Sequence, residues 1–377
     1  MKAGAPGRPI ALMSAGAAGA FGFEWKGLAQ AIADNCIELK IAAALSESHP
    51  GTIGAEVPAI PKELDAGDVR VHRQMSRAAR LAAICARRAL KEARFDAPRD
   101  DIAYFLGVGA SGGAMGDLLA VLRASLDGES LSMSKFGEQG LLASNPVGTF
   151  QLLNNFTLCH SSILEGTGGA NGAFFSRGGG TIIALHEAAH SLLENDCQRA
   201  LAGGADSALH PVTWAELIRE GYATHGFVPA EGAGIFALQM GEHFDAIAYL
   251  RHCSLHCITQ AGGAKVLDEA RLRVLLQALL QNTHDIDWIG LLPWGGGARP
   301  ILHNAASEIF PGAIRWDITK ILGDSLAAAP ALGWAAALSA IASEIAQCAL
   351  VINAGIDGQL GLVVLSRKPC AFSWRLL

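Results

Sequence analysis

Two histidines and a glutamate stand at the spacing of a zinc-protease helix. The stretch TIIALHEAAHSLL contains His186, Glu187 and His190. On a helix the two histidines lie one turn apart and can bind Zn²⁺, while the glutamate activates water. The site also needs a third ligand, which the following residues SLLENDCQ do not supply; Glu216 and Glu220 are the remaining candidates. The motif alone leaves zinc chemistry open.

A glycine-rich stretch, GVGASGG, has the spacing of a dinucleotide-binding turn. Gly107, Gly109 and Gly112 follow a predicted strand and precede a helix, where backbone N–H groups can hold a pyrophosphate. Such a turn normally opens the first strand–helix–strand unit, whereas this one lies more than 100 residues into the chain. The acidic residue expected afterwards, Asp127 or Glu129, falls in a loop-like stretch. Nucleotide binding is therefore disfavoured.

The stretch RHCSLHC places two histidines and two cysteines within six residues. In a strand, Cys253 and Cys257 would lie about 13 Å apart on one face, and His252 and His256 equally far apart on the other. One tetrahedral zinc ion cannot span that distance. We expect no metal site there.

The composition indicates a large globular protein with a buried core. The chain has 377 residues, of which 51% are hydrophobic and 17% charged, and its net charge of -6 argues against nucleic-acid binding. Eight cysteines without a CxxC pair predict reduced thiols of a cytoplasmic protein. The apolar run IALMSAGAAGAFG, near the N-terminus, is either a first buried strand or an imitation of a signal peptide. We predict no transmembrane helix, because the longest apolar stretch carries Glu344.

Short apolar runs alternate with helical patterns, which predicts an α/β protein with mostly buried sheets. Strand-rich segments recur in both parts of the chain and suggest two similar halves, 1–245 and 246–377. The helix predicted at 72–94 carries seven basic side chains, which could form a solvated face or dock an acidic partner. The predicted strands are 9–15, 102–109, 199–206, 232–240, 245–255, 287–294, 348–354 and 360–367.

The segment 169–207 resembles the centre of the β-ketoacyl synthases of the thiolase superfamily. Gly169-Ala170-Asn171 is similar to the Gly-Pro-Asn before the nucleophile turn, and Ala202-Gly203-Gly204 to the Ala-Gly-Gly strand after it. IALMSAGAAGAFG, FLGVGASGG, NPVGTFQLLNNFTLCHSSILEG and GFVPAEGAGIFAL resemble further family segments in the family's order. The resemblance implies a layered αβαβα fold with two pseudo-symmetric halves, each with a mixed five-stranded sheet. It also makes HEAAH part of a packed helix.

The positions that carry the family's chemistry are changed. The family uses a Cys as nucleophile and two His for decarboxylation; by resemblance these positions hold Gly178, Trp294 and Asp324. A glycine cannot form an acyl-enzyme, and an anionic Asp would oppose the charge of an enolate. The family's gatekeeper Phe corresponds roughly to Ile356. The resemblance therefore implies that the chain alone is catalytically inactive.

The closest functional precedent within this resemblance is the chain-length factor, a silent synthase homologue of type II polyketide and aryl-polyene pathways. It implies pairing with an active ketosynthase across NGAFFS, substrates delivered on an acyl carrier protein, an acyl tunnel at the interface, and neither cofactor nor metal. Two alternatives remain: a Cys-independent acyltransferase on the same fold, and a zinc hydrolase. By resemblance the tunnel and interface candidates are Ala110, Ser111, Ala114, Met115, Phe156, Phe174, Phe175 and Ile356.

Overall fold

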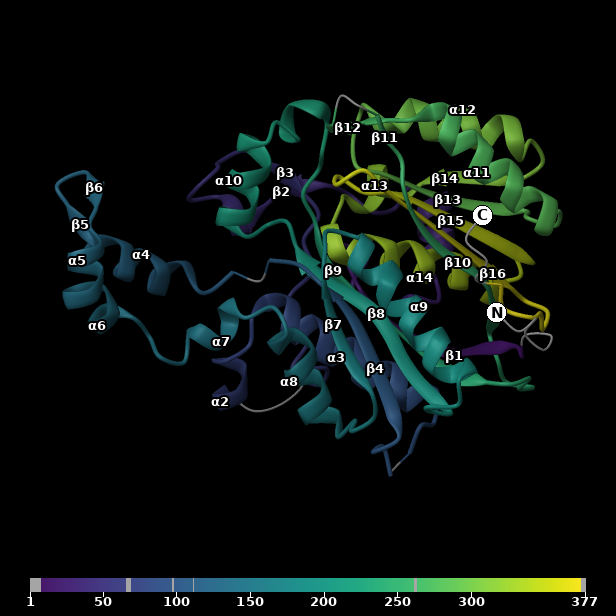
Figure 1. Cartoon of the computed structure of the whole chain (residues 1–377), viewed down its shortest axis with the longest axis horizontal. Helices are drawn as coiled ribbons and strands as arrows, with labels where there is room; N and C mark the ends of the chain where they lie inside the picture. Colours follow the sequence, from purple (N-terminus) through teal and green to yellow (C-terminus); the bar gives the residue numbers. More distant parts are fainter. Residues whose placement is uncertain (1–7, 66–68, 97, 111, 261–262, 374–377) are drawn as a thin grey trace.

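The computed structural model describes residues 8–65, 69–96, 98–110, 112–260 and 263–373 (Figure 1). Ten strands form one hydrogen-bonded sheet, in the order β14-β13-β15-β16-β10-β1-β9-β8-β4-β7. The first half of the chain supplies β1 (Ile10–Ala18), β4 (Ile102–Val108), β7 (Asn171–Phe175), β8 (Arg199–Ser207) and β9 (Glu231–Met240). The second half supplies β10 (Ala248–Cys257), β13 (Trp288–Pro293), β14 (Ile314–Asp317), β15 (Cys348–Ala354) and β16 (Gln359–Ser366).

The two halves repeat one topology. In each, the second strand in sequence pairs in parallel with the third and the fourth, and the fifth pairs antiparallel with the fourth and the first. The halves meet where β1 pairs with β10, over only two residue pairs. The sheet therefore consists of two mixed five-stranded units, as predicted.

Two buried helices lie between the sheet units. Helix α9 (Gly179–Leu193) packs on β4 and β8 and also contacts β10 and β16, while α14 (Ala329–Ala342) packs on β13 and β15 and also contacts β9. Helices α3 (Arg77–Glu92) and α8 (Phe156–Glu165) cover the outer side of the first half, and α11 (Glu269–Asn282) and α12 (Ala298–Ile309) that of the second. This is the predicted αβαβα layering.

Glycines allow α9 to lie close to the sheet. A Cβ atom on Gly107 or on Gly204 would overlap the side chain of Thr181, which lies in the first turn of α9. Gly107, in GVGASGG, and Gly204, in the Ala-Gly-Gly strand, therefore serve helix–sheet packing.

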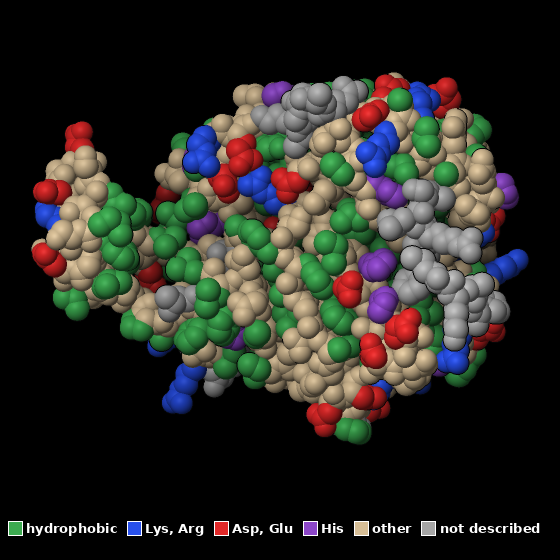
Figure 2. Space-filling view, in the orientation of Figure 1, with side chains coloured by type: hydrophobic (Ala, Val, Ile, Leu, Met, Phe, Trp, Pro, Cys, Tyr) green, Lys and Arg blue, Asp and Glu red, His purple; other side chains and the backbone are tan. Residues whose placement is uncertain are grey.

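An arm projects from the first half, at the left of Figure 1. Figure 2 shows hydrophobic side chains gathered on the side of this arm that faces the body. Exposed hydrophobic residues of the arm include Leu119, Leu122, Met133, Leu141 and Leu142. The arm is built from α4 (Met115–Ala124), β5 (Leu126–Asp127), β6 (Ser130–Leu131), α5 (Met133–Lys135) and α6 (Leu141–Ala143), and α7 (Thr149–Leu152) leads back to the body.

The remaining elements are short, apart from α10, and connect the layers. They are α1 (Leu28–Ala33), β2 (Lys40–Ile41), β3 (Ile53–Gly54), α2 (Val69–His72), α10 (Pro211–Arg219), β11 (Thr259–Gln260), β12 (Gly263–Leu267) and α13 (Ile318–Leu322), with 3₁₀ turns at Ala43–Leu45, Ala223–His225 and Leu326–Ala328 and a π turn at Phe136–Gly140.

All eight predicted strands are present, and the run near the N-terminus forms β1, which is buried throughout. The helix predicted at 72–94 was wrong at its start: α3 begins at Arg77, because the Ser76 hydroxyl caps it by accepting a hydrogen bond from the Ala79 N–H at 3.2 Å. Glu344 lies in the turn between α14 and β15, with a φ of 61°. In the part of the chain that the structure describes, no helix is both long and apolar enough to cross a membrane.

Candidate functional site

The turn between β7 and α9 presents no side chain at its key position. Gly178 is buried there, immediately before the first residue of α9. Its φ of +91° is a conformation that side chains rarely adopt and glycine adopts freely. A Cβ atom would have the Asn353 Nδ2 as its nearest neighbour, at 3.3 Å. A side chain at this position would therefore strain the turn and press on Asn353, and the glycine that occupies it offers no nucleophile.

Asp324 lies opposite this turn, after α13, and only 7% of it is exposed. Its Oδ1 accepts a hydrogen bond from the Leu326 N–H at 2.8 Å. Burial raises the pKa of this carboxyl to about 7, and the nearby Asp206 contributes to the rise. Asp324 is therefore only partly ionised near neutral pH.

Asp206, near the end of β8, is the second buried carboxyl of the site. Burial raises its pKa to about 6, against hydrogen bonds donated by the N–H groups of Ser207, at 2.8 Å, and Ala327, at 3.2 Å. Asp206 and Asp324 thus hold the same 3₁₀ turn, Leu326–Ala328, from the two halves of the fold.

Trp294 follows β13 and is 1% exposed. Its ring meets that of Tyr222 edge-on, with centroids 5.2 Å apart, and its backbone N–H donates to the Ala354 carbonyl at 3.1 Å. Among the described residues the indole Nε1 finds no acceptor. An indole has no basic nitrogen, so Trp294 packs the core and cannot exchange a proton with a substrate.

A cavity of only about 10 Å³ remains between the turn and Asp324. That is about the space of one water molecule, far too little for an acyl thioester. The structure brings Gly178, Asp324 and Ile356 together around it, while Trp294 lies behind Ala354 and does not line it. Its lining residues are Arg177, Gly178, Asp324, Leu326, Asn353, Gly355 and Ile356; we call this space the remnant cavity.

HEAAH lies on α9, as predicted, and the helix is mostly buried. His186 and Glu187 are themselves half-exposed, with the His186 Nδ1 3.7 Å from a Glu187 carboxylate oxygen. Across the described residues, no cluster of three or more His, Cys, Asp or Glu side chains is arranged to hold a metal ion.

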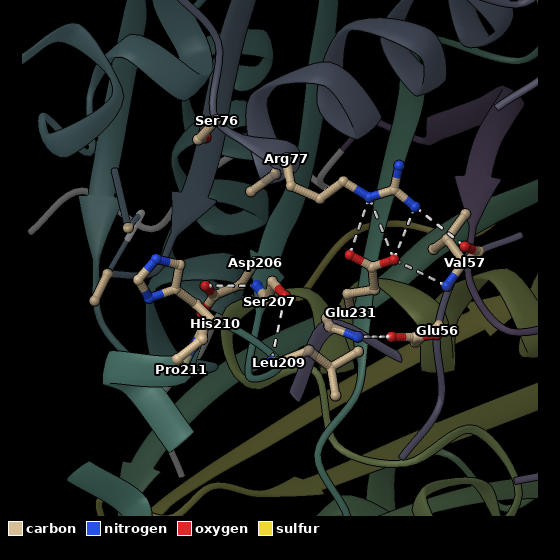
Figure 3. Close-up of a pocket in the computed structure, with 14 residues that line it drawn as sticks. Glu56, Val57, Ser76, Arg77, Asp206, Ser207, Leu209, His210, Pro211 and Glu231 are labelled. Carbon is tan, nitrogen blue, oxygen red and sulfur yellow. Dashed lines mark hydrogen bonds and ion pairs between the residues drawn. The ribbon is translucent and has the colours of Figure 1, made fainter. Parts of the chain in front are cut away.

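A larger pocket of about 320 Å³ lies beside the start of α3 (Figure 3). The buried Glu231 carboxylate receives the Arg77 guanidinium, with NH2 at 2.9 Å and Nε at 3.1 Å, and the Val57 N–H at 3.0 Å. These contacts pair the charges of Arg77 and Glu231, and Glu56 and Asp206 also line the pocket. On another side the pocket is lined by Ala110 and Gly112, from the loop after β4.

Comparisons with known proteins identify the family. The β-ketoacyl synthase N-terminal domain matches residues 33–243, more than half of the chain. The chain belongs to the β-ketoacyl synthase family. Curated protein sequences give no match.

Solved synthase structures share the fold over nearly the whole chain, each with a TM-score of 0.74. The ishigamide ketosynthase/chain length factor is 18% identical, covering 97% of this chain and 100% of its own. AntDE:AntF, a type II PKS acyl-carrier protein in complex with its ketosynthase, is 11% identical, and a β-ketoacyl synthase from Burkholderia phymatum STM815 is 14% identical. Both cover 96% of this chain and 100% of their own.

The predicted wall and interface residues of this synthase-family chain occupy two regions. Ala110 and Ala114 are exposed and Met115 is half-buried, all in or next to the loop after β4. Ser111 lies outside the described residues. Phe156 begins α8 and packs on the ring of Phe150, with centroids 4.9 Å apart.

The two phenylalanines of β7 point to different surroundings. Phe174 is half-buried and stacks on Phe105, with ring centroids 6.5 Å apart. Phe175 is 63% exposed, on a strand that forms the edge of the sheet. Ile356 is 2% exposed and lines the remnant cavity, together with Arg177 and Gly178 from the turn that follows β7.

The basic residues of α3 are mostly used inside the fold. Arg77 pairs with Glu231, and further ion pairs at 2.7 Å join Arg80 to Asp65, Arg87 to Glu165 and Arg88 to Glu24. The helix therefore presents much less free positive charge than its sequence suggests.

The sequence reasoning missed three groups of the site: Asp206, Asn353 and the ion pairs of Arg177. One signal was available in the sequence, since Glu216, within α10, and Glu220, at its C-terminal end, are spaced one helical turn apart, but this spacing predicts a metal-ligand pair. The structure places both against Arg177 instead.

Proposed function

We propose that this chain is a non-catalytic subunit, similar to a chain-length factor, that pairs with an active β-ketoacyl synthase and shapes its acyl tunnel. The observation that carries this proposal is the remnant cavity. The family frame is intact, yet the place of the chemistry offers a glycine, a partly ionised buried carboxyl and about 10 Å³ of space. Condensation would then take place at the partner's site.

The edge strand β7 and the apolar arm support pairing with a synthase. An edge strand with Phe175 exposed at 63% offers unpaired backbone groups and apolar surface together. The exposed leucines of the arm extend this apolar surface, which is typical of an obligate interface. We propose that the partner synthase covers both.

The loop after β4 supports a tunnel role. Ala110 is exposed and lines the 320 Å³ pocket, and Ala114 has a similarly small side chain. We propose that these side chains, with Met115, Phe156 and Phe174, form the wall that limits the partner's acyl chain. The growing acyl chain is delivered to the partner synthase on an acyl carrier protein, in the cytoplasm.

We also propose 1–245 and 246–377 as the two domain halves. The gap between β9, which ends at Met240, and β10, which begins at Ala248, supports this boundary.

Co-expression with the ketosynthase of the same host tests the function. We expect a complex that survives gel filtration and condenses malonyl carrier protein, whereas this chain alone does neither decarboxylation nor condensation. Robust condensation by the isolated chain would refute the proposal. In the complex, replacing the partner's nucleophilic Cys should abolish product.

A matched pair of variants tests the interface. Phe175→Asp puts a charge on the edge of the sheet and should abolish the complex while leaving the fold intact. Phe244→Asp places the same charge on a fully exposed residue between β9 and β10 and should leave the complex intact. If Phe175→Asp still forms the complex as Phe244→Asp does, β7 is not the interface.

The second candidate, a Cys-independent acyltransferase, rests on one observation: Asp324 has a pKa of about 7, which suits a general base. It predicts turnover by the isolated chain that Asp324→Ala abolishes. The size of the remnant cavity disfavours it.

A further inference from the structure

Arg177 stands directly before Gly178 and lines the remnant cavity. It lies in the turn between β7 and α9, so its backbone is fixed by an edge strand on one side and by a buried helix on the other. Its side chain is 23% exposed and therefore lies at the boundary between the cavity and solvent.

Carboxylates from two other elements surround the Arg177 guanidinium. Glu220, just after α10, is 2.9 Å from NH1, and Glu216, within α10, is 3.3 Å from NH2. Asp357, in the turn between β15 and β16, has an oxygen 3.9 Å from NH1. One arginine therefore ties together the nucleophile turn, α10 and the last hairpin. We call these four residues the Arg177 cluster.

Further hydrogen bonds hold the same hairpin over the cavity. The Tyr222 hydroxyl donates to the Ile356 carbonyl at 2.6 Å, and the Ser176 hydroxyl donates to the Gln359 Oε1 at 3.3 Å. Trp294 supports the Tyr222 ring from beneath. The hairpin between β15 and β16 is therefore held by Tyr222, near α10, and by Ser176, in the turn between β7 and α9. These two contacts fix the walls of the remnant cavity.

We propose that the Arg177 cluster is a lock that closes the remnant site against acyl thioesters. The inference deepens the proposed function and rests on it, because a subunit that only shapes its partner's tunnel must not hold substrate at its own degenerate site. The lock is electrostatic. Without the guanidinium, three carboxylates would face one another, and their repulsion would push α10 and the hairpin apart.

A cysteine placed in the wall of the cavity reports whether the lock is closed. Gly355→Cys places a thiol in this wall; its Cβ atom would lie 3.3 Å from the Arg177 carbonyl, a tight contact that the turn must relieve by a shift of a few tenths of an ångström. The exposed Cys36 and Cys257 are first changed to serine, and alkylation of position 355 by a neutral maleimide is followed by peptide mass spectrometry. Ile356→Cys, at a buried position that lines the same cavity, serves as a second reporter in the same background.

We expect slow labelling of Cys at position 355 when Arg177 is present, and acceleration of about ten-fold or more after Arg177→Ala, the size expected when several partly exposed ion pairs are lost together. Arg219→Ala is the matched control: Arg219 also pairs with Glu216, at 3.7 Å, but is 77% exposed and does not line the cavity. It should leave the labelling rate unchanged. Circular dichroism checks that each variant is folded.

Two results would overturn the lock. One is labelling of both reporters, with Arg177 in place, as fast as that of the exposed Cys36 in the parent protein. The other is an equal rate with and without Arg177. Because labelling needs neither partner nor turnover, failure of the lock leaves the pairing with a synthase standing, and failure to pair leaves the labelling result unaffected.

Discussion

Replacing Asp324 with asparagine should stabilise the protein relative to the unchanged chain, and this difference should grow as the pH rises. The change keeps the shape of the side chain and an oxygen that can still accept the hydrogen bond from the Leu326 N–H. It removes only the ionisation. The carboxyl has a pKa of about 7 in the folded protein, against an ordinary value of 3.8, and burial is the main cause.

The direction of this pH effect depends on whether the folded or the unfolded chain holds the proton of Asp324 more tightly. Below pH 3.8 both the folded and the unfolded chain keep the proton, so the group contributes nothing to the pH dependence. Between pH 3.8 and about pH 7 the Asp324 carboxyl loses its proton in the unfolded chain but keeps it in the folded chain. The folded state therefore loses stability as the pH rises through this range. The full effect is about 4 kcal/mol, of which about 2.5 kcal/mol falls between about pH 5 and about pH 8.

Urea unfolding at those two pH values measures the effect. The difference in unfolding free energy between Asp324→Asn and the unchanged chain should grow by about 2.5 kcal/mol in favour of the variant from the lower to the higher pH. Titrating groups that do not interact with Asp324 cancel in this difference, and Asp206, which does interact with it, adds only a smaller contribution. If the two proteins instead respond to pH in parallel, Asp324 is not a buried acid with a raised pKa, and the reasoning fails.

Two further perturbations have definite outcomes. Trp294→Ala should lower the unfolding free energy by about 3–5 kcal/mol in urea, because it empties a fully buried site beside Tyr222, and a loss below about 1 kcal/mol would contradict this packing. His252, which shares the hydroxyl of Ser254 with His256, has its pKa lowered to about 4 by burial, so the fold should lose stability as the pH falls from 6.5 towards 4. His252→Gln should flatten that part of the pH profile, and an unchanged slope would count against a neutral buried imidazole.

The strands could be predicted because each is a short apolar run bounded by turn residues. Two strands of the ten-stranded sheet are exceptions, β7 with five residues and β14 with four. Neither has a buried residue, so neither leaves a run that reads as a buried strand. The start of α3 was also missed, since the helical pattern continues through 72–76 and only the capping hydroxyl of Ser76 shows where the helix begins. Local patterns report burial and periodicity, and they carry little information on caps.

The candidate site likewise has features that could be predicted from the sequence and features that could not. The proposed loss of the nucleophile and of both histidines could be predicted from Gly178, Trp294 and Asp324, because each falls within a segment whose order and spacing resemble the family. The Arg177 cluster was not readable: its members come from positions 177, 216, 220 and 357, and nothing in the local sequence says that they meet. The pKa values of Asp206 and Asp324 likewise depend on burial by both halves of the fold.

By itself, then, the sequence determined the order of the elements, the layered architecture and which chemical groups are present at the degenerate site, since residue type and periodicity are local properties. Only the tertiary structure decided how much space is left among those groups, which carboxyl groups keep a proton and which ion pairs close the cavity. These depend on distances between segments up to 180 positions apart, as between Arg177 and Asp357, and such distances are set by the packing of the two halves around α9 and α14.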